Sequence, residues 1–283
     1  MRKAPSERHA DPAKKKGLTT LLGCGLLILF IIIAVFADMI APHDPWERFD
    51  PYLPPNTSHW LGTNDLGHDI FSELIHGSRV SLLVGLGAAV LATAIGLCIG
   101  LFAGYYKGVT DEILMGGTDV FLMIPRIPLI ILLAAFLKPS FWIIALVIGF
   151  LWWTSTARVV RSKSLQVSEM NFVLSSKCLG FSDRHIIFSD ILPNIIQIVI
   201  PKFMLTVAAA MITEASLSFL GLGDPSMKSW GMMINFAFTK GGLINAMWWW
   251  FIPPGLCITL FVYSVVLLGY SFEEKEQAAM GAG

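Results

Sequence analysis

Long stretches of this sequence carry almost no charged side chains. Residues 18–40 form the first of them, and this stretch is long enough to cross the hydrocarbon core of a bilayer, which takes about 20 helical residues. Of all 283 residues, 55% are hydrophobic and only 14% are charged, a balance that departs from the averages of soluble domains. The chain is therefore predicted to be an all-α membrane protein.

Further apolar stretches follow the first, so we predict six membrane-spanning helices in all. The other spans are expected at about 79–105, 112–137, 141–160, 195–220 and 247–270. In the second span, Gly96, Gly100 and Gly104 recur on one helical face, where small residues let another helix approach closely. The third span contains two prolines within residues 124–128, so we expect it to be kinked there.

The polar segments set the expected domain boundaries. Residues 1–17 form a basic tail, and residues 18–78 combine the first span with a loop whose many prolines exclude a continuous helix. Residues 79–270 form the transmembrane core, and residues 271–283 form a second tail. The four cysteines are isolated, without metal-binding or redox spacing, and are interpreted as small packing residues.

The distribution of positive charge predicts how the spans are oriented. The basic tail shares one side of the predicted topology with a cluster around the end of the fourth span: Arg158, Arg161, Lys163, Lys177 and Arg184. Basic loops face the cytoplasm, so both termini are expected to be cytoplasmic. Residues 248–250, three consecutive tryptophans, are expected in the aromatic belt at the outer interface. The formal net charge is zero and gives no indication of nucleic-acid binding.

Residues 171–194 form a polar island between two apolar runs and are predicted to be two short helices with a break between them. Gly180 can take the left-handed conformation that ends a helix. Ser182 or Asp183 can then cap the next helix, and Pro193 fits the first turn of the segment that follows. A helix-turn-helix fixed in this way between two spans could transmit force.

The same stretch resembles the coupling loop of ABC importer permeases, whose pattern is Glu-Ala-Ala, then Gly, then Ile-x-Leu-Pro. In this sequence the triplet is replaced by Leu-Ser-Ser, Asp190 stands at the usual Ile position, and the glycine and the closing Leu-Pro are retained. The resemblance assigns the following residues to the ATPase-coupling loop: Leu174, Ser175, Ser176, Gly180, Asp183, Ile191, Leu192 and Pro193.

Other motifs between about Trp60 and Gly231 resemble the dipeptide/oligopeptide/nickel branch of this family. They are WLGTNDLGHDIFSELIHGSRVSL, AGYYKGVTDEILMGGTDVFLMIP and EASLSFLGLGDPSMKSWGMM. The resemblance implies a type I ABC importer permease in the cytoplasmic membrane that translocates di- or oligopeptides, with nickel chelates, glutathione or oligosaccharides as alternatives. It also implies a heterodimer with a homologous permease, two ABC ATPase subunits, an extracytoplasmic solute-binding protein and contact with membrane lipid.

The sequence contains no phosphate-binding loop of the Gly-x4-Gly-Lys-Ser/Thr type. We therefore expect no cofactor and no enzymatic activity in this chain, with ATP and Mg²⁺ bound by partner subunits. A group of loop residues could suggest a metal site, but their spacing matches no known cluster and a structural role is favoured. They are His43, His59, His68, His76, Asp44, Asp65 and Asp69. An ion-coupled secondary transporter is the rival class, although no inverted repeat is evident.

Two carboxylates lie within predicted spans, where an ionised group is costly and is normally paired or faces a polar cavity. Glu214, with Ser218 on the same helical face, is interpreted either as a translocation-pathway residue or as a residue that locks helices through a basic or hydroxyl partner. The second interpretation is favoured. Asp119 has the same two interpretations, with Arg126 as a candidate partner.

Overall fold

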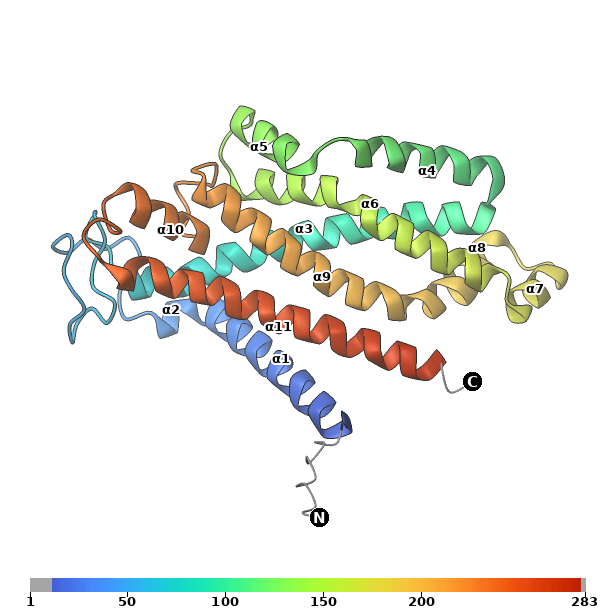
Figure 1. Cartoon of the computed structure of the whole chain (residues 1–283), viewed down its shortest axis with the longest axis horizontal. Coiled ribbons are helices and arrows are strands. Elements are labelled where there is room, and N and C mark those ends of the chain that lie inside the picture. Colours follow the sequence, from blue (N-terminus) through green and yellow to red (C-terminus); the bar gives the residue numbers. More distant parts are fainter. Residues whose placement is uncertain (1–11, 281–283) are drawn as a thin grey trace, which may run out of the picture.

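The computed structural model describes the backbone of residues 12–280 and the side chains of residues 19–273. Over this range the chain is built from helices and connecting loops (Figure 1). The helices are α1 (Pro12–Val35), α2 (Ala37–Ile40), α3 (Ile70–Tyr106), α4 (Gly108–Met123), α5 (Arg126–Phe136), α6 (Phe141–Ser168), α7 (Asn171–Cys178), α8 (Asp183–His185), the π-helix η1 (Ile186–Ile191), α9 (Leu192–Phe219), α10 (Trp230–Thr239) and α11 (Trp248–Met280).

The long helices run side by side along the molecule, with α4 and α5 flanking one side and α1 the other (Figure 1). The loop of residues 41–69 and helix α10 lie at one end, which we call the loop end. Helices α7 and α8 lie at the opposite end, the α7 end. The bundle contains three apolar clusters, and α3 and α9 contribute to all of them, so these two helices form its centre.

Four helical segments in the described part of the chain are long and apolar enough to cross a membrane. They are Ile70–Tyr106, Phe141–Ser168, Asp183–Phe219 and Trp248–Glu273. Helices α4 and α5 would form a fifth span if they are taken together, but they are bent by 77° at the break between them. The interruption expected at residues 124–128 is therefore confirmed, and it is a break of the helix. The apolar part of α1, Thr19–Val35, is shorter than these four segments, so the structure supports four or five of the six expected spans.

Helices α3 and α6 approach each other closely along the glycine face predicted from the sequence. A Cβ atom at Gly100 would lie 2.6 Å from the carbonyl oxygen of Ala157, and one at Gly104 would lie 2.6 Å from the Cβ of Ser164. Gly96 faces Thr156 and Trp153 in the same way, at 2.7 Å. Such contacts leave no room for a side chain, so the three glycines set the distance between the two helices.

Helix α3 begins at Ile70, well before the expected start at Arg79, so the loop after α2 ends at residue 69. The cause is a local cap: the side chain of Asp69 accepts hydrogen bonds from the backbone amide of Ser72, at 2.8 Å, and from its hydroxyl, at 2.7 Å. The polar residues that follow suggested a loop, but they lie on a helix whose first turn is held by this carboxylate.

The tryptophans at residues 248–250 do not form a common belt. Trp250 is fully buried in the cluster with Phe261 and Met233, whereas Trp248 is exposed. Because they are consecutive residues of the first turn of α11, they point in different directions, and one of them must face the bundle. The expectation of an interfacial belt is therefore wrong for Trp250.

We predict that Gly100→Ala destabilises the protein, because the added methyl group overlaps the backbone of α6 and overpacking typically costs about 1–3 kcal/mol. The matched control is Gly116→Ala in α4, where a Cβ atom meets nothing within 4 Å. That change should keep or raise stability, since alanine is favoured over glycine within a helix by about 0.5–1 kcal/mol. Thermal unfolding in detergent measures both, and equal midpoints for the two variants would contradict the close-packing argument.

Candidate functional site

The stretch between α6 and α9 forms a helical turn at the α7 end of the molecule. Helix α7 is closed by Gly180 at φ +81°, with the amide of Gly180 donating to the carbonyl of Lys177 at 3.0 Å and the amide of Phe181 donating to that of Ser176 at 3.1 Å. This pair of bonds is the Schellman arrangement, in which a left-handed glycine satisfies the last carbonyls of a helix. The left-handed conformation expected for Gly180 is thus confirmed.

The second half of the stretch differs from the expectation. The hydroxyl of Ser182 caps α8 by accepting from the amide of His185 at 3.4 Å, as one of the two expected caps. Helix α8 then continues through the π-helix η1 into α9 without interruption, so no separate short helix ends at Pro193. Pro193 lies just after η1 at the start of α9, and the wider turn of the π-helix accommodates a residue that lacks an N–H donor within this continuous helix.

The inner face of this stretch is buried in the bundle. Val173 of α7 and Ile186, Ile187 and Ile191 of η1 pack with residues of α3 and α6 in one apolar cluster. The stretch is therefore held on a packed core and is not a loose loop.

The outer face presents apolar side chains on both sides of the turn. Leu179 is 76% exposed, and Phe172, Leu174 and Phe181 are about half exposed. Several exposed apolar groups around one turn indicate contact with another molecule. The hydroxyls of Ser175 and Ser176 bond to carbonyls of their own helix, so these two residues contribute a polar helix surface beside the apolar groups.

A contact that the sequence did not reveal ties this stretch to the end of α3. The hydroxyl of Tyr105 donates a hydrogen bond to Oδ1 of Asp183 at 2.6 Å, and the ammonium of Lys177 lies 4.7 Å from the centre of the same ring. Tyr105 itself is buried. The partners are far apart in sequence, and only the fold brings them together.

The residues predicted for the coupling loop lie together at the α7 end, but they differ in their contacts and in their exposure. Asp183 holds the stretch to α3, Ile191 is buried, Leu192 is half-buried and Pro193 is exposed. Glu214 and Ser218 lie toward the opposite end of α9, and Asp119 lies on α4. The candidate residues therefore form one cluster around the turn, with the span carboxylates elsewhere.

Glu214 is buried between helices. Its Oε1 accepts a hydrogen bond from the hydroxyl of Ser218 at 2.7 Å, one turn along α9. Ser218 in turn lies against Gly223 and Gly231, close enough that a Cβ at either glycine would approach it within 2.7 Å. The hydroxyl partner of Glu214 thus belongs to α9 itself, and its Oε2 is buried without a hydrogen-bond partner among the described residues, so both interpretations of this carboxylate stay predictions.

Asp119 does not pair with Arg126, so that expectation is wrong. Its carboxylate accepts from Arg158 of α6 at 2.7 Å, whereas Arg126 donates to the hydroxyl of Thr154 and lies over the ring of Trp152. The bend between α4 and α5 separates residues 119 and 126, which would lie near one another on a continuous helix. A second arginine of α6, Arg161, is paired in the same way with Asp111 of α4.

The loop histidines and aspartates are engaged within the loop end. Nδ1 of His59 lies 2.9 Å from Oδ1 of Asp69, and His43 lies beside them, so that one ligand atom from each falls within 4.8 Å of the others. The second oxygen of Asp69 already accepts from Ser72. This carboxylate thus orients His59 and caps α3, and these contacts are what the structural role favoured from the sequence requires.

Two family models match parts of the sequence. Residues 96–275 match the model described as binding-protein-dependent transport system inner membrane component. Residues 19–55 match the N-terminal TM domain of oligopeptide transport permease C. The chain belongs to the binding-protein-dependent inner membrane permease family. The resemblance inferred from the motifs is thereby confirmed.

Curated relatives of this permease match it over most of its length. The oligopeptide transport system permease protein OppC of Bacillus subtilis (strain 168) is 36% identical over 250 residues, covering 87% of this chain and 81% of that protein. The dipeptide transport system permease protein DppC of the same strain is 34% identical over 278 residues, covering 96% and 86%. The glutathione transport system permease protein GsiD of Pectobacterium atrosepticum is 35% identical over 253 residues, covering 88% and 83%.

We predict that Tyr105→Phe loosens the turn of this permease while leaving its core packed, because the change removes only the hydroxyl that holds Asp183. Hydrogen bonds to charged groups contribute about 1.5–3 kcal/mol, so amide exchange in residues 171–191 should accelerate about tenfold or more. Hydrogen-exchange mass spectrometry checks this. The control is Tyr106→Phe, whose half-exposed side chain makes ring contacts and whose hydroxyl makes no hydrogen bond to any residue that the structure describes. Equal exchange in both variants would contradict the anchoring role of Tyr105.

Proposed function

We propose that this chain is a permease subunit of an ATP-driven importer that carries di- and oligopeptides across the cytoplasmic membrane. Its spans are α1, α3, the broken pair α4 and α5, α6, α9 and α11, which gives six crossings with both termini in the cytoplasm. The α7 end is the cytoplasmic end, and the loop end faces outward. This orientation follows from the basic residues near the end of α6 and in α7.

The observation that carries the proposal is the similarity to oligopeptide and dipeptide permeases over nearly the whole chain. The geometry of residues 171–194 supports it independently. A folded turn with an exposed apolar face, fixed to the ends of α3, α6 and α9, is suited to receive force from another protein.

The partners are a homologous permease, two ATPase subunits and an extracytoplasmic solute-binding protein. ATP and Mg²⁺ are bound by the ATPases, which dock on the turn around Gly180. When ATP closes the ATPase dimer, α7 and α8 move with it. The movement reaches α9 directly through η1 and reaches α3 through the bond between Tyr105 and Asp183. The solute then crosses between the two permeases.

Glutathione is the second candidate substrate, because the glutathione permease relative is as similar as the peptide permeases. Glutathione is itself a small peptide, so the same machinery would serve either. Binding measurements on the cognate solute-binding protein with glutathione and with linear peptides distinguish them. ATP-driven uptake of the bound solute by the reconstituted complex tests the function as a whole.

We predict that Gly180→Leu inserts into the membrane but fails to couple the ATPase subunits to solute uptake. A side chain in the left-handed conformation costs roughly 1–2 kcal/mol, which distorts the turn, and the leucine adds bulk on the docking face. Inside the chain a Cβ at this position meets nothing within 4 Å, so the core is unaffected. Co-purification of the ATPases and solute-dependent uptake should both fall at matched membrane abundance.

The control for this variant is Gly180→Asn, because asparagine adopts the left-handed conformation more readily than other residues with a side chain. It should retain most of the ATPase binding and uptake. Wild-type co-purification and uptake in Gly180→Leu would show that residues 171–194 are not the coupling element.

The proposed orientation predicts which cysteines are labelled from outside. Native Cys178 is exposed at the end of α7, and Asn56 is exposed in the loop of residues 41–69. In intact cells, Asn56→Cys in a Cys178→Ser background should react with a membrane-impermeant thiol reagent, whereas native Cys178 should react only after permeabilisation. The reverse pattern would place the α7 end outside and refute the orientation.

A further inference from the structure

Three side chains of metal-binding type meet at the loop end, where the loop of residues 41–69 reaches the start of α3 (Figure 1). They are His43, His59 and Asp69, and one ligand atom from each lies within 4.8 Å of the others. His59 and Asp69 are buried, whereas His43 is partly exposed. Their spacing in the sequence matches no known cluster, so it is the fold that brings them together.

The carboxylate of Asp69 is held so that one oxygen is directed at the histidines. Its Oδ2 accepts hydrogen bonds from the backbone amide and the hydroxyl of Ser72, whereas its Oδ1 lies 2.9 Å from Nδ1 of His59. The hydroxyl of Ser72 also accepts from the backbone amide of His43 at 3.2 Å. One serine therefore positions both the carboxylate and the segment that carries His43, as the supporting hydrogen bonds around a metal site do.

The ring of His43 is oriented by a backbone carbonyl. Its Nε2 donates to the carbonyl oxygen of Ser58 at 3.1 Å, which leaves the lone pair of the neutral ring on Nδ1. Nδ1 makes no hydrogen bond to any residue that the structure describes, and the carboxylate of Glu47 lies 4.0 Å from it. Histidines that bind a metal commonly donate their other N–H group to a carbonyl in this way. The bond between His59 and Asp69 does not explain this arrangement of His43.

The distances suit a four-coordinate ion. Zn²⁺ binds histidine nitrogen and carboxylate oxygen at about 2.0–2.2 Å, so the ligand atoms of a tetrahedral site lie roughly 3.4 Å apart. The 2.9 Å between His59 and Asp69 is close to this separation. The partly exposed His43 can close the remaining distance by rotation of its side chain, and the exposed Glu47 beside it can supply a fourth ligand.

The surroundings and the ligand types favour zinc over the common hard cations. The ring of Phe49 packs against both imidazoles, with its centroid 4.9 Å from that of His43 and 4.5 Å from that of His59, and so covers one side of the group. Imidazole nitrogen suits Zn²⁺, whereas Mg²⁺ and Ca²⁺ take oxygen ligands. Two carboxylates, Asp69 and Glu47, balance the charge of one divalent ion.

We propose that His43, His59 and Asp69 bind Zn²⁺, with Glu47 as the fourth ligand. The ion takes the place of the hydrogen bond between His59 and Asp69. It joins the segment after α2, the middle of the loop and the N-cap of α3, so it holds the loop of residues 41–69 on the bundle. This structural role is independent of the solute that the permease transports.

The test measures zinc binding to the full-length chain in detergent. The chain is purified with an affinity tag that lacks histidine, stripped of metal with EDTA and dialysed, and it carries Cys98→Ser and Cys178→Ser because these two thiols are exposed. Isothermal titration calorimetry should show one Zn²⁺ per chain. At a hundredfold excess over its Kd, Zn²⁺ should raise the midpoint of thermal unfolding by roughly 5 °C, whereas Mg²⁺ and Ca²⁺ at the same concentration should not.

Two ligand variants and a control locate the ion. His43→Gln and His59→Gln should each weaken zinc binding by about tenfold or more. His43→Gln is the sharper variant, because it leaves the bond between His59 and Asp69 and the cap of α3 intact. Without zinc it should unfold near the wild-type midpoint, and with zinc it should lose the rise. His185→Gln removes an exposed histidine at the α7 end and should bind zinc like the parent chain.

The outcomes decide between a zinc site and a purely hydrogen-bonded loop. Zinc affinity that is lost in both ligand variants and kept in His185→Gln supports the site. Unchanged affinity in His43→Gln would refute it, whatever His59→Gln does, because the buried pair alone would then account for the geometry. Equal weakening in His185→Gln would indicate dispersed surface binding and would refute it as well, as would the lack of saturable zinc binding.

Discussion

The close approach of α3 and α6 is the contact on which the rest of the structure depends. In a bilayer, burying apolar side chains between helices gains little free energy, because the lipid tails are equally apolar. Association of helices therefore relies on close packing and on small residues that let the backbones approach each other. Gly96, Gly100 and Gly104 provide this over several turns of α3. Because the contact extends to the α7 end, it fixes the position at which α6 ends and α7 begins.

The turn at the α7 end is consequently attached to three helices in three different ways. It follows α6 after a short connection, where Lys107 at the end of α3 also pairs with Glu169 at 2.9 Å. It continues into α9 as an unbroken helix, and it is bonded to α3 through Tyr105 and Asp183. A displacement of the turn therefore acts on the two central helices of the bundle together, which a loop attached at its ends alone would not achieve.

Features that depend on neighbouring residues could be predicted from the sequence, and those that depend on distant contacts could not. Four of the six expected spans, the glycine face of α3, the break before α5 and the left-handed Gly180 all follow from local pattern and backbone preference. The partner of Asp119 was predicted wrongly because a local candidate, Arg126, was preferred over Arg158 of another helix. Tyr105 gave no signal, since its hydroxyl acquires a role only when Asp183 is folded against it.

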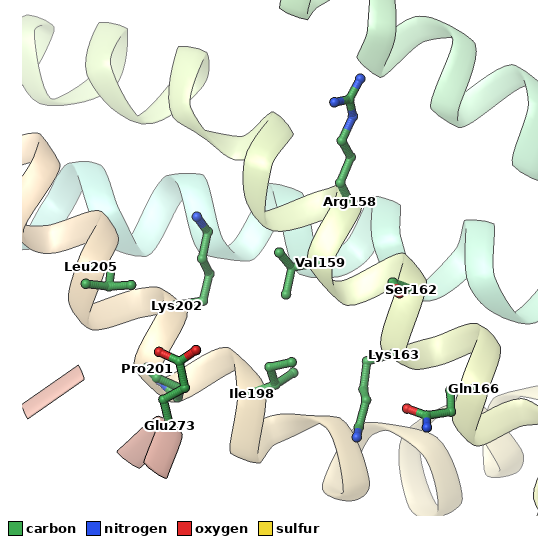
Figure 2. Close-up of a pocket in the computed structure, with 10 residues that line it drawn as sticks. All are labelled: Arg158, Val159, Ser162, Lys163, Gln166, Ile198, Pro201, Lys202, Leu205 and Glu273. Atoms are coloured by element: carbon green, nitrogen blue, oxygen red, sulfur yellow. The ribbon is translucent and has the colours of Figure 1, made fainter. Parts of the chain in front are cut away.

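The two ends of the molecule differ in how their polar groups are satisfied, and this difference indicates where other molecules act. At the loop end, the ammonium of Lys228 contacts Glu73 and His68 and lies over the ring of Trp46, which connects α3, the loop of residues 41–69 and the segment before α10. Those charges are used inside the chain and stiffen that end. Toward the α7 end, Lys202 lines a cavity between α6 and α9 (Figure 2), and Leu179 is exposed. The loop end is therefore stiffened by contacts within the chain, whereas the α7 end exposes apolar side chains to contact with other molecules.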